Sequence, residues 1–186
     1  MAVAAAVAGG EARAGDTLLG SRDHAVSERG HRMTLRFERG YATVVVRRTV
    51  HNASRRPAEA AYSLFPPDGG VVVGVRMRAD DGQRWHAGRL LAADAAFAGY
   101  RARTGVDRGR AGPSGATALL AWQPDGLSLD LFPVAAGGER TVEYTIDMPA
   151  YWEEGRWRVD LGDPWNDEEL AGQLVVQAAD PAAPKL

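Results

Sequence analysis

The sequence predicts a mainly β fold of antiparallel strands with one short α-helix at about residues 90–102. Apolar and polar residues alternate in several segments, most clearly at 127–132, as in strands that bury one face. Clusters of Gly, Pro, Asn and Asp separate these segments, which is typical of turns between antiparallel strands. Only residues 90–102 break the alternation, because they are rich in alanine and Ala93, Phe97 and Tyr100 recur at helical spacing.

The composition is that of one domain of ordinary size. The 186 residues are 45% apolar and 25% charged, and the formal net charge is −2. We therefore expect no nucleic-acid partner, since nucleic-acid binders usually carry a basic excess. The chain has no cysteine, which excludes disulfides and thiolate chemistry, and no apolar run approaches the roughly 20 residues of a transmembrane helix. With 21 Arg, one Lys and abundant Ala, the composition is typical of a GC-rich genome, so we expect a bacterial source.

Five strands are predicted before the helix. Residues 1–30 show no period and are interpreted as a mobile Ala/Gly-rich leader, and the β domain is expected to span residues 31–162. The strands are expected to form an antiparallel meander at 31–38, 41–51, 58–65, 71–78 and 83–87. Apolar residues on both faces indicate that the strand at 41–51 lies near the middle of a sheet. Alternate residues of the fourth strand are predicted to share one face: Val71, Val73, Val75 and Met77.

After the helix, residues 103–116 are predicted to be a mobile Gly-rich loop. Further strands are expected at 117–122, 127–132, 140–148 and 156–161. Residues 163–186 are interpreted as an acidic segment, a possible last strand at 170–178 and a Pro/Ala tail.

Six features occur in order within residues 30–162. They are Asn52 with Pro57-Ala-Glu-Ala60 after a Val-rich strand; Tyr62-Ser-Leu-Phe65-Pro66; Gly88 before the Ala-rich helix that ends near Tyr100; Ala118-Leu119-Leu120; Leu131-Phe132-Pro133 with Gly137-Gly138; and Val142-Glu-Tyr144-Thr. In this order they resemble the VIT domain, which is named from vault proteins and inter-α-trypsin inhibitor heavy chains.

The resemblance implies an antiparallel β-sandwich-like module that is not catalytic and serves as a scaffold or a contact for a partner protein or adjacent domain. It also implies a place beside a von Willebrand A domain in longer, often exported proteins, which favours the cell envelope or secretion over the cytoplasm. The chain carries no Asp-x-Ser-x-Ser metal motif of such an A-type domain. A second hypothesis is therefore that the chain is a fragment of a longer protein whose activity lies elsewhere.

A hydrolase with a dispersed site is the third hypothesis. The nearest approach to a catalytic serine is Gly112-Pro-Ser114-Gly115, which lacks the glycine two residues after the serine that a nucleophile elbow needs. The histidines include no i,i+4 pair of the helical zinc signature: His24, His31, His51 and His86. The acidic run at 160–169 offers oxygen ligands for calcium, but its spacing does not match an EF-hand loop. We therefore expect no metal and no cofactor.

Arginines and tryptophans are the candidate partner contacts. Four arginines gather at the predicted helix end and the following loop: Arg101, Arg103, Arg108 and Arg110. Their guanidinium groups suit carboxylate or phosphate partners, although screened surface charges at a helix C-terminus would show the same pattern. Trp152 and Trp165 fall in predicted loops and are also candidate contacts, whereas Trp122 and Trp157 fall in predicted strands and are expected in the core.

Overall fold

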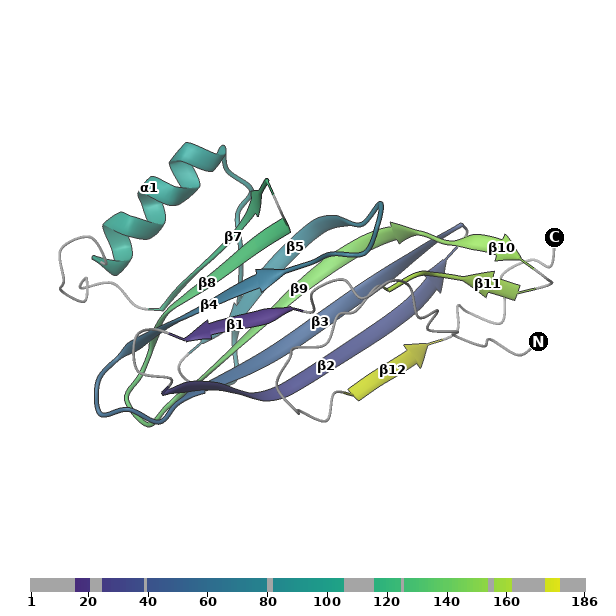
Figure 1. The fold of residues 1–186 in the computed structure, drawn as a ribbon. Coiled ribbons are helices and arrows are strands. Elements are labelled where there is room, and N and C mark those ends of the chain that lie inside the picture. The colour runs from purple at the N-terminus through teal and green to yellow at the C-terminus, as the bar shows by residue number, and fades with distance from the viewer. Residues whose placement is uncertain are drawn as a thin grey trace.

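Two β-sheets lie face to face with the hydrophobic core between them (Figure 1). The computed structural model describes residues 16–20, 25–38, 40–79, 82–105, 116–124, 126–153, 156–161 and 173–177. The four-stranded sheet has the order β1 (Thr17–Gly20), β4 (Ala58–Leu64), β8 (Gly126–Val134) and β7 (Thr117–Gln123). The six-stranded sheet has the order β12 (Gln173–Gln177), β2 (Val26–Glu38), β3 (Tyr41–Asn52), β9 (Glu139–Pro149), β5 (Val71–Arg78) and β6 (Trp85–Ala87). The hairpin of β10 (Tyr151–Glu153) and β11 (Arg156–Arg158) and the helix α1 (Ala93–Thr104) complete the described elements. The prediction of a mainly β fold with one short helix is confirmed.

Alternation along the central strands fills the core. On β3, Val44 and Val46 are buried while Val45 between them is half-buried on the opposite face. On β8, Leu129 and Leu131 are fully buried in the same core. Burying each such side chain contributes about 2 kcal/mol. β3 lies between β2 and β9, so the prediction of a central strand is confirmed.

The turn after β3 forms as predicted, and it also ties the two sheets together. The Asn52 side chain donates from Nδ2 to the carbonyl oxygens of Arg56 at 2.7 Å and Val134 at 2.9 Å. Its Oδ1 accepts a hydrogen bond from the Ser54 backbone N–H at 2.9 Å. Since Val134 ends β8, the same side chain closes the turn and holds the end of the opposite sheet.

The predicted meander is wrong in its strand order. β4 leaves the sheet of β3 and pairs with β8 and β1 in the opposite sheet, and β9 inserts between β3 and β5. The alternation of apolar and polar residues indicates which face of a strand is buried. It does not indicate which strand pairs with it, because that strand can come from a distant part of the chain. The pairing of β12 with β2 is parallel, at the edge of the six-stranded sheet.

The predicted common face of the fourth strand is also wrong. The register of β5 against β9 shifts between Val72 and Gly74, so the faces of the strand exchange there. Val71 and Val73 are consequently 56% and 55% exposed, whereas Met77 is buried.

Described structure begins before residue 31. β1 and the first residues of β2 lie within the predicted leader, and β1 pairs with β4 from Thr17 opposite Ser63 to Gly20 opposite Ala60. The helix is shifted slightly toward the C-terminus, and β12 falls within the predicted strand at 170–178. Most of the loop at 103–116, the acidic segment at 163–169 and the tail at 180–186 lie outside the described residues.

Candidate functional site

The outer face of the six-stranded sheet is rich in polar side chains. On β2, Met33 and Leu35 point into the core, so Arg32, Thr34 and Arg36 alternate onto the outer face. The register of the neighbouring strands continues this face across the whole sheet, because residues opposite each other in a ladder project to the same side.

Two cross-strand rows follow from that register. The first, here called the arginine row, joins five strands: Arg32 lies opposite Arg47, Arg47 and Arg76 both lie opposite Glu143, and Arg76 lies opposite Ala87. The second, the floor row, contains smaller side chains: Thr34 opposite Val45, and Val45 and Gly74 both opposite Thr145.

The two rows enclose a depression of about 640 Å³, here called the trough, which Arg36 and Val75 also line. The trough runs across the strands, because the large side chains of the arginine row form its wall and the small side chains of the floor row form its floor. Gly74 keeps the floor open, since a Cβ added there would meet no atom within 4 Å. A larger side chain therefore fits at position 74, and such a substitution would fill the trough.

Glu143 holds two arginines of the arginine row in place. Its Oε2 accepts from Arg47 Nε at 2.9 Å and Nη2 at 2.7 Å, and its Oε1 accepts from Arg76 Nε at 2.5 Å and pairs with Arg76 Nη2. The side chain of Glu143 is 4% exposed, whereas those of Arg47 and Arg76 are 39% and 47% exposed. The buried carboxylate therefore anchors two guanidinium groups that still face solvent.

Trp85 on β6 supports the same arginines. The guanidinium carbons of Arg47, Arg76 and Arg78 lie 5.3, 4.6 and 5.2 Å from the centroid of a Trp85 ring, within the range of cation–π contacts. The indole thus gathers three positive charges at one end of the arginine row.

The lining of the trough is positively charged. Four arginines against one glutamate give a formal charge of +3. Outside the trough on the same face, Asp147 accepts a hydrogen bond from Thr43 Oγ1 at 2.7 Å. The trough is therefore suited to a negatively charged ligand, although the whole chain has a net charge of −2.

A carboxyl pair lies on the outer face of the four-stranded sheet, toward α1. Tyr100 of α1 donates from its hydroxyl to Glu59 Oε1 of β4 at 2.6 Å. Burial, and then the charge of Glu59, raise the pKa of Asp130 on β8 from 3.8 to about 6. Burial and the Glu59 contact also raise the pKa of Tyr100, so its hydroxyl stays protonated as the donor.

We expect Asp130→Asn to stabilise the protein above pH 6 and to have little effect below pH 4. Because the folded state holds the Asp130 proton more tightly than the unfolded state, the wild-type carboxyl loses stability as pH rises through this window. The gain above pH 6 is about 2 kcal/mol, since each pKa unit is worth about 1.4 kcal/mol and partial exposure screens the charge. Urea unfolding of both proteins from pH 3.5 to 8 measures the difference.

The stability of the variant must be compared with that of the wild type at each pH, because protonation of His31 changes stability with pH in the opposite direction to Asp130. Burial, and then the charge of Arg48, lower the pKa of His31 from 6.5 to about 3, so this group destabilises the fold as pH falls below 6.5. A gain for Asp130→Asn that is equal at pH 4 and pH 8 would show that the raised pKa of Asp130 is not the cause.

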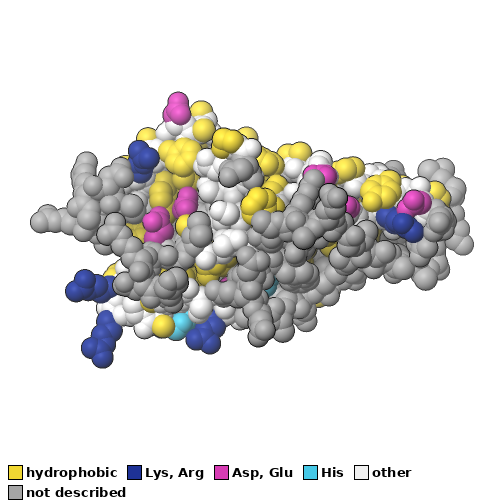
Figure 2. Space-filling model, viewed as in Figure 1, with side chains coloured by type: hydrophobic (Ala, Val, Ile, Leu, Met, Phe, Trp, Pro, Cys, Tyr) yellow, Lys and Arg dark blue, Asp and Glu magenta, His cyan; other side chains and the backbone are white. Residues whose placement is uncertain are grey.

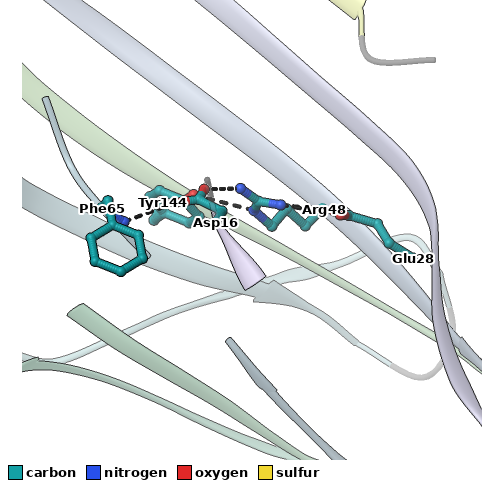
Figure 3. A network of polar contacts seen from close by, with 5 residues as sticks. All are labelled: Asp16, Glu28, Arg48, Phe65 and Tyr144. Carbon is teal, nitrogen blue, oxygen red and sulfur yellow. Dashed lines mark hydrogen bonds and ion pairs between the residues drawn. The ribbon is translucent and has the colours of Figure 1, made fainter. Parts of the chain in front are cut away.

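A buried polar cluster around Arg48 of the six-stranded sheet reaches Asp16, which directly precedes β1 of the four-stranded sheet (Figure 3). Arg48 pairs with Asp16 and, at 3.1 Å, with Glu28, and its Nε donates to the Tyr144 hydroxyl at 3.2 Å. Asp16 Oδ1 in turn accepts from the Phe65 backbone N–H at 2.8 Å. Burial by itself lowers the pKa of Arg48, but Tyr144, Asp16 and Glu28 together raise it above its usual value. The cluster is fully enclosed, so its role is structural.

The predicted contact residues that the structure describes do not all lie together. Arg101 and Arg103 are exposed near the end of α1, whereas Trp152 lies on β10, and these elements are at opposite ends of the structure (Figure 1). Trp152 belongs to a strand rather than a loop, is 54% exposed and packs edge-on against Trp157 with ring centroids 5.4 Å apart. Figure 2 shows hydrophobic side chains at the surface near both ends. Three other predicted site residues lie outside the described residues: Arg108, Arg110 and Trp165.

The two tryptophans predicted in the core behave differently. Trp157 is half-buried and packs against the core, as expected. The prediction for Trp122 is wrong, because this side chain is 58% exposed. It lies near the end of β7, which is an edge strand of the four-stranded sheet. Ser114, the candidate serine of the hydrolase hypothesis, lies outside the described residues.

Sequence reasoning missed the arginine row. Arg32 was visible as a polar position of an alternating strand, but nothing local indicated that Arg47, Glu143 and Arg76 lie in line with it. Those three residues are joined only by the pairing of β3 and β5 with β9.

Neither a family model nor a curated protein matches the sequence. The class that the structure defines is a mainly β sandwich of two sheets with one short helix. In the part of the chain that the structure describes, no helix is long and apolar enough to cross a membrane, and no three His, Asp or Glu side chains gather to hold a metal ion.

Proposed function

We propose that this chain is a non-catalytic interaction module of the VIT type, which contacts a partner protein or a neighbouring domain through the trough. The observation that carries the proposal is the trough itself, with half-exposed guanidinium groups anchored on one buried carboxylate. The ordered sequence features from Asn52 to Tyr144 that resemble the VIT domain support the same class of function.

The trough has the rigidity that a recognition site needs. Its side chains project from strands of the six-stranded sheet, and Glu143 and Trp85 hold Arg47 and Arg76 in place before any partner arrives. Preorganised groups on regular elements lose little conformational entropy on binding, so more of the contact energy appears as affinity.

Filling the trough is expected to weaken partner binding without unfolding the protein. In Gly74→Leu the new side chain projects into the open floor, and we expect the affinity for a partner purified from the native host extract to fall at least tenfold. Gly99→Leu is the matched control, since a Cβ at Gly99 on α1 also meets no atom within 4 Å but lies far from the trough. Calorimetric titration of the purified partner into each variant measures the change.

Equal affinities in Gly74→Leu and Gly99→Leu would remove the trough from the binding site. A further variant tests the contacts predicted from sequence, with Arg101, Arg103, Arg108 and Arg110 each changed to Gln and Trp152 and Trp165 to Ala. If only that variant loses the partner, the site includes these six residues and not the trough.

A further inference from the structure

We infer that the occupant of the trough is an extended acidic segment of a partner protein, held through its side-chain carboxylates by Arg32, Arg47 and Arg76. The inference rests on the proposed function above and names the chemistry of the partner. It is carried by three features of the trough: the hydrogen-bonding capacity left on its arginines, its charge and its length.

The arginines retain capacity for a second carboxylate. Glu143 occupies the Nε and Nη2 groups of both Arg47 and Arg76, which leaves each Nη1 group without a partner among the described residues. A guanidinium offers two edges that each fit a carboxylate in a bidentate arrangement. The side chains of Arg47 and Arg76 are 39% and 47% exposed and line the trough, and exposed Arg32 continues the row on β2.

Charge selects an acidic occupant. The arginines of the lining outnumber its one glutamate, so the trough attracts an acidic segment more strongly than a neutral one. Glu143 supplies one negative charge against the three guanidinium groups that gather over Trp85, so an acidic segment relieves the repulsion that remains among them.

Length and direction select an extended segment. The trough crosses β2, β3, β9, β5 and β6, and at a strand spacing of about 4.8 Å it is about 19 Å long. A segment of about six extended residues has this length, at about 3.3 Å per residue. Because the trough runs across the strands, the segment does not pair with a sheet edge, and its side chains provide the recognition.

The probe is a fluorescein-labelled hexapeptide of alternating Glu and Thr, and binding is followed by fluorescence anisotropy. The same peptide with Gln in place of Glu is the neutral control. We expect the Glu peptide to bind at least tenfold more tightly than the Gln peptide, and its affinity to fall as salt rises from about 50 to 300 mM, as for contacts between exposed charges.

Substitutions in the trough and a control substitution on α1 test where the peptide binds. Arg32→Gln and Arg76→Gln are each expected to weaken the Glu peptide about three- to tenfold, and Gly74→Leu at least tenfold, whereas Gly99→Leu leaves it unchanged. The Arg76→Lys variant should bind the Glu peptide with an affinity between those of the wild type and Arg76→Gln, because lysine keeps the charge but cannot form a bidentate contact. Circular dichroism of each variant checks that the fold is retained.

Several outcomes would overturn the inference. Equal binding of the Glu and Gln peptides would remove the acidic specificity, and tighter binding of a thymidine hexanucleotide than of the Glu peptide would assign the trough to single-stranded nucleic acid. If no peptide binds but Gly74→Leu still loses the purified partner, the proposed function stands and the acidic chemistry is wrong. If neither the peptide nor the partner responds to Gly74→Leu, both are wrong.

Discussion

Replacing Arg48 by methionine is expected to lower the free energy of unfolding by about 3 to 5 kcal/mol. The side chain of Arg48 is fully buried and pairs with the carboxylates of Asp16 and Glu28. Methionine has a similar length but no charge, so Arg48→Met leaves two buried carboxylates without their cation. The expected loss is a large part of the roughly 5 to 15 kcal/mol that stabilises a typical domain. Denaturant unfolding followed by tryptophan fluorescence measures it.

The neighbouring residue supplies the control. Arg47 is the preceding residue on β3, but it faces outward and shares Glu143 with Arg76, so Arg47→Met is expected to cost at most about 1 kcal/mol. Adding Asp16→Asn and Glu28→Gln to Arg48→Met should recover much of the lost stability, because this cluster then holds no buried charge. Failure of the triple variant to recover would show that packing, and not charge, accounts for the loss.

Gly126→Ala is expected to cost about 3 kcal/mol, the second largest effect. Gly126 begins β8 with φ of 150°, a conformation that side chains rarely adopt, and a Cβ there would lie 2.6 Å from the Leu64 carbonyl oxygen. The backbone of β4 must therefore move to accept the methyl group. The midpoint and slope of urea unfolding measure the loss.

Gly40→Ala is the control that separates the cost of backbone strain from the cost of the steric clash at Gly126. Gly40 has φ of 83° in the turn between β2 and β3, but a Cβ there would meet no atom within 4 Å. It is expected to cost about 1 kcal/mol from strain alone. Equal losses for Gly40→Ala and Gly126→Ala would mean that the contact with Leu64 does not matter.

Much of the secondary structure could be predicted because its cause is local. The buried leucines of β8 alternate with polar neighbours, and an Ala-rich segment without alternation forms α1. Asn52 closes the turn after β3 with its own side chain. The bulge in β5 could not be predicted, because it arises from the fit of that strand against β9 and not from the run of valines itself.

The candidate site was less predictable than the fold. The prediction relied on arginines that are close in sequence, Arg101 to Arg110, and their role as contacts stays a prediction. The trough instead combines β2, β3, β9, β5 and β6, which span residues 26 to 149. No local pattern marks Glu143 as the partner of both Arg47 and Arg76.

The sequence by itself determined most of the strands, where the helix and turns fall, and which faces of β3 and β8 are apolar, since these follow from periodicity and turn chemistry. It did not indicate β1 or β10. The tertiary structure decided that β4 joins the opposite sheet and that β9 separates β3 from β5. It also decided that Arg48 is buried while Arg47 is half-exposed, and that one buried glutamate joins arginines of two distant strands. The physical reason is that strand pairing and sheet packing bring together residues far apart in sequence, and burial and charge pairing are properties of those neighbours.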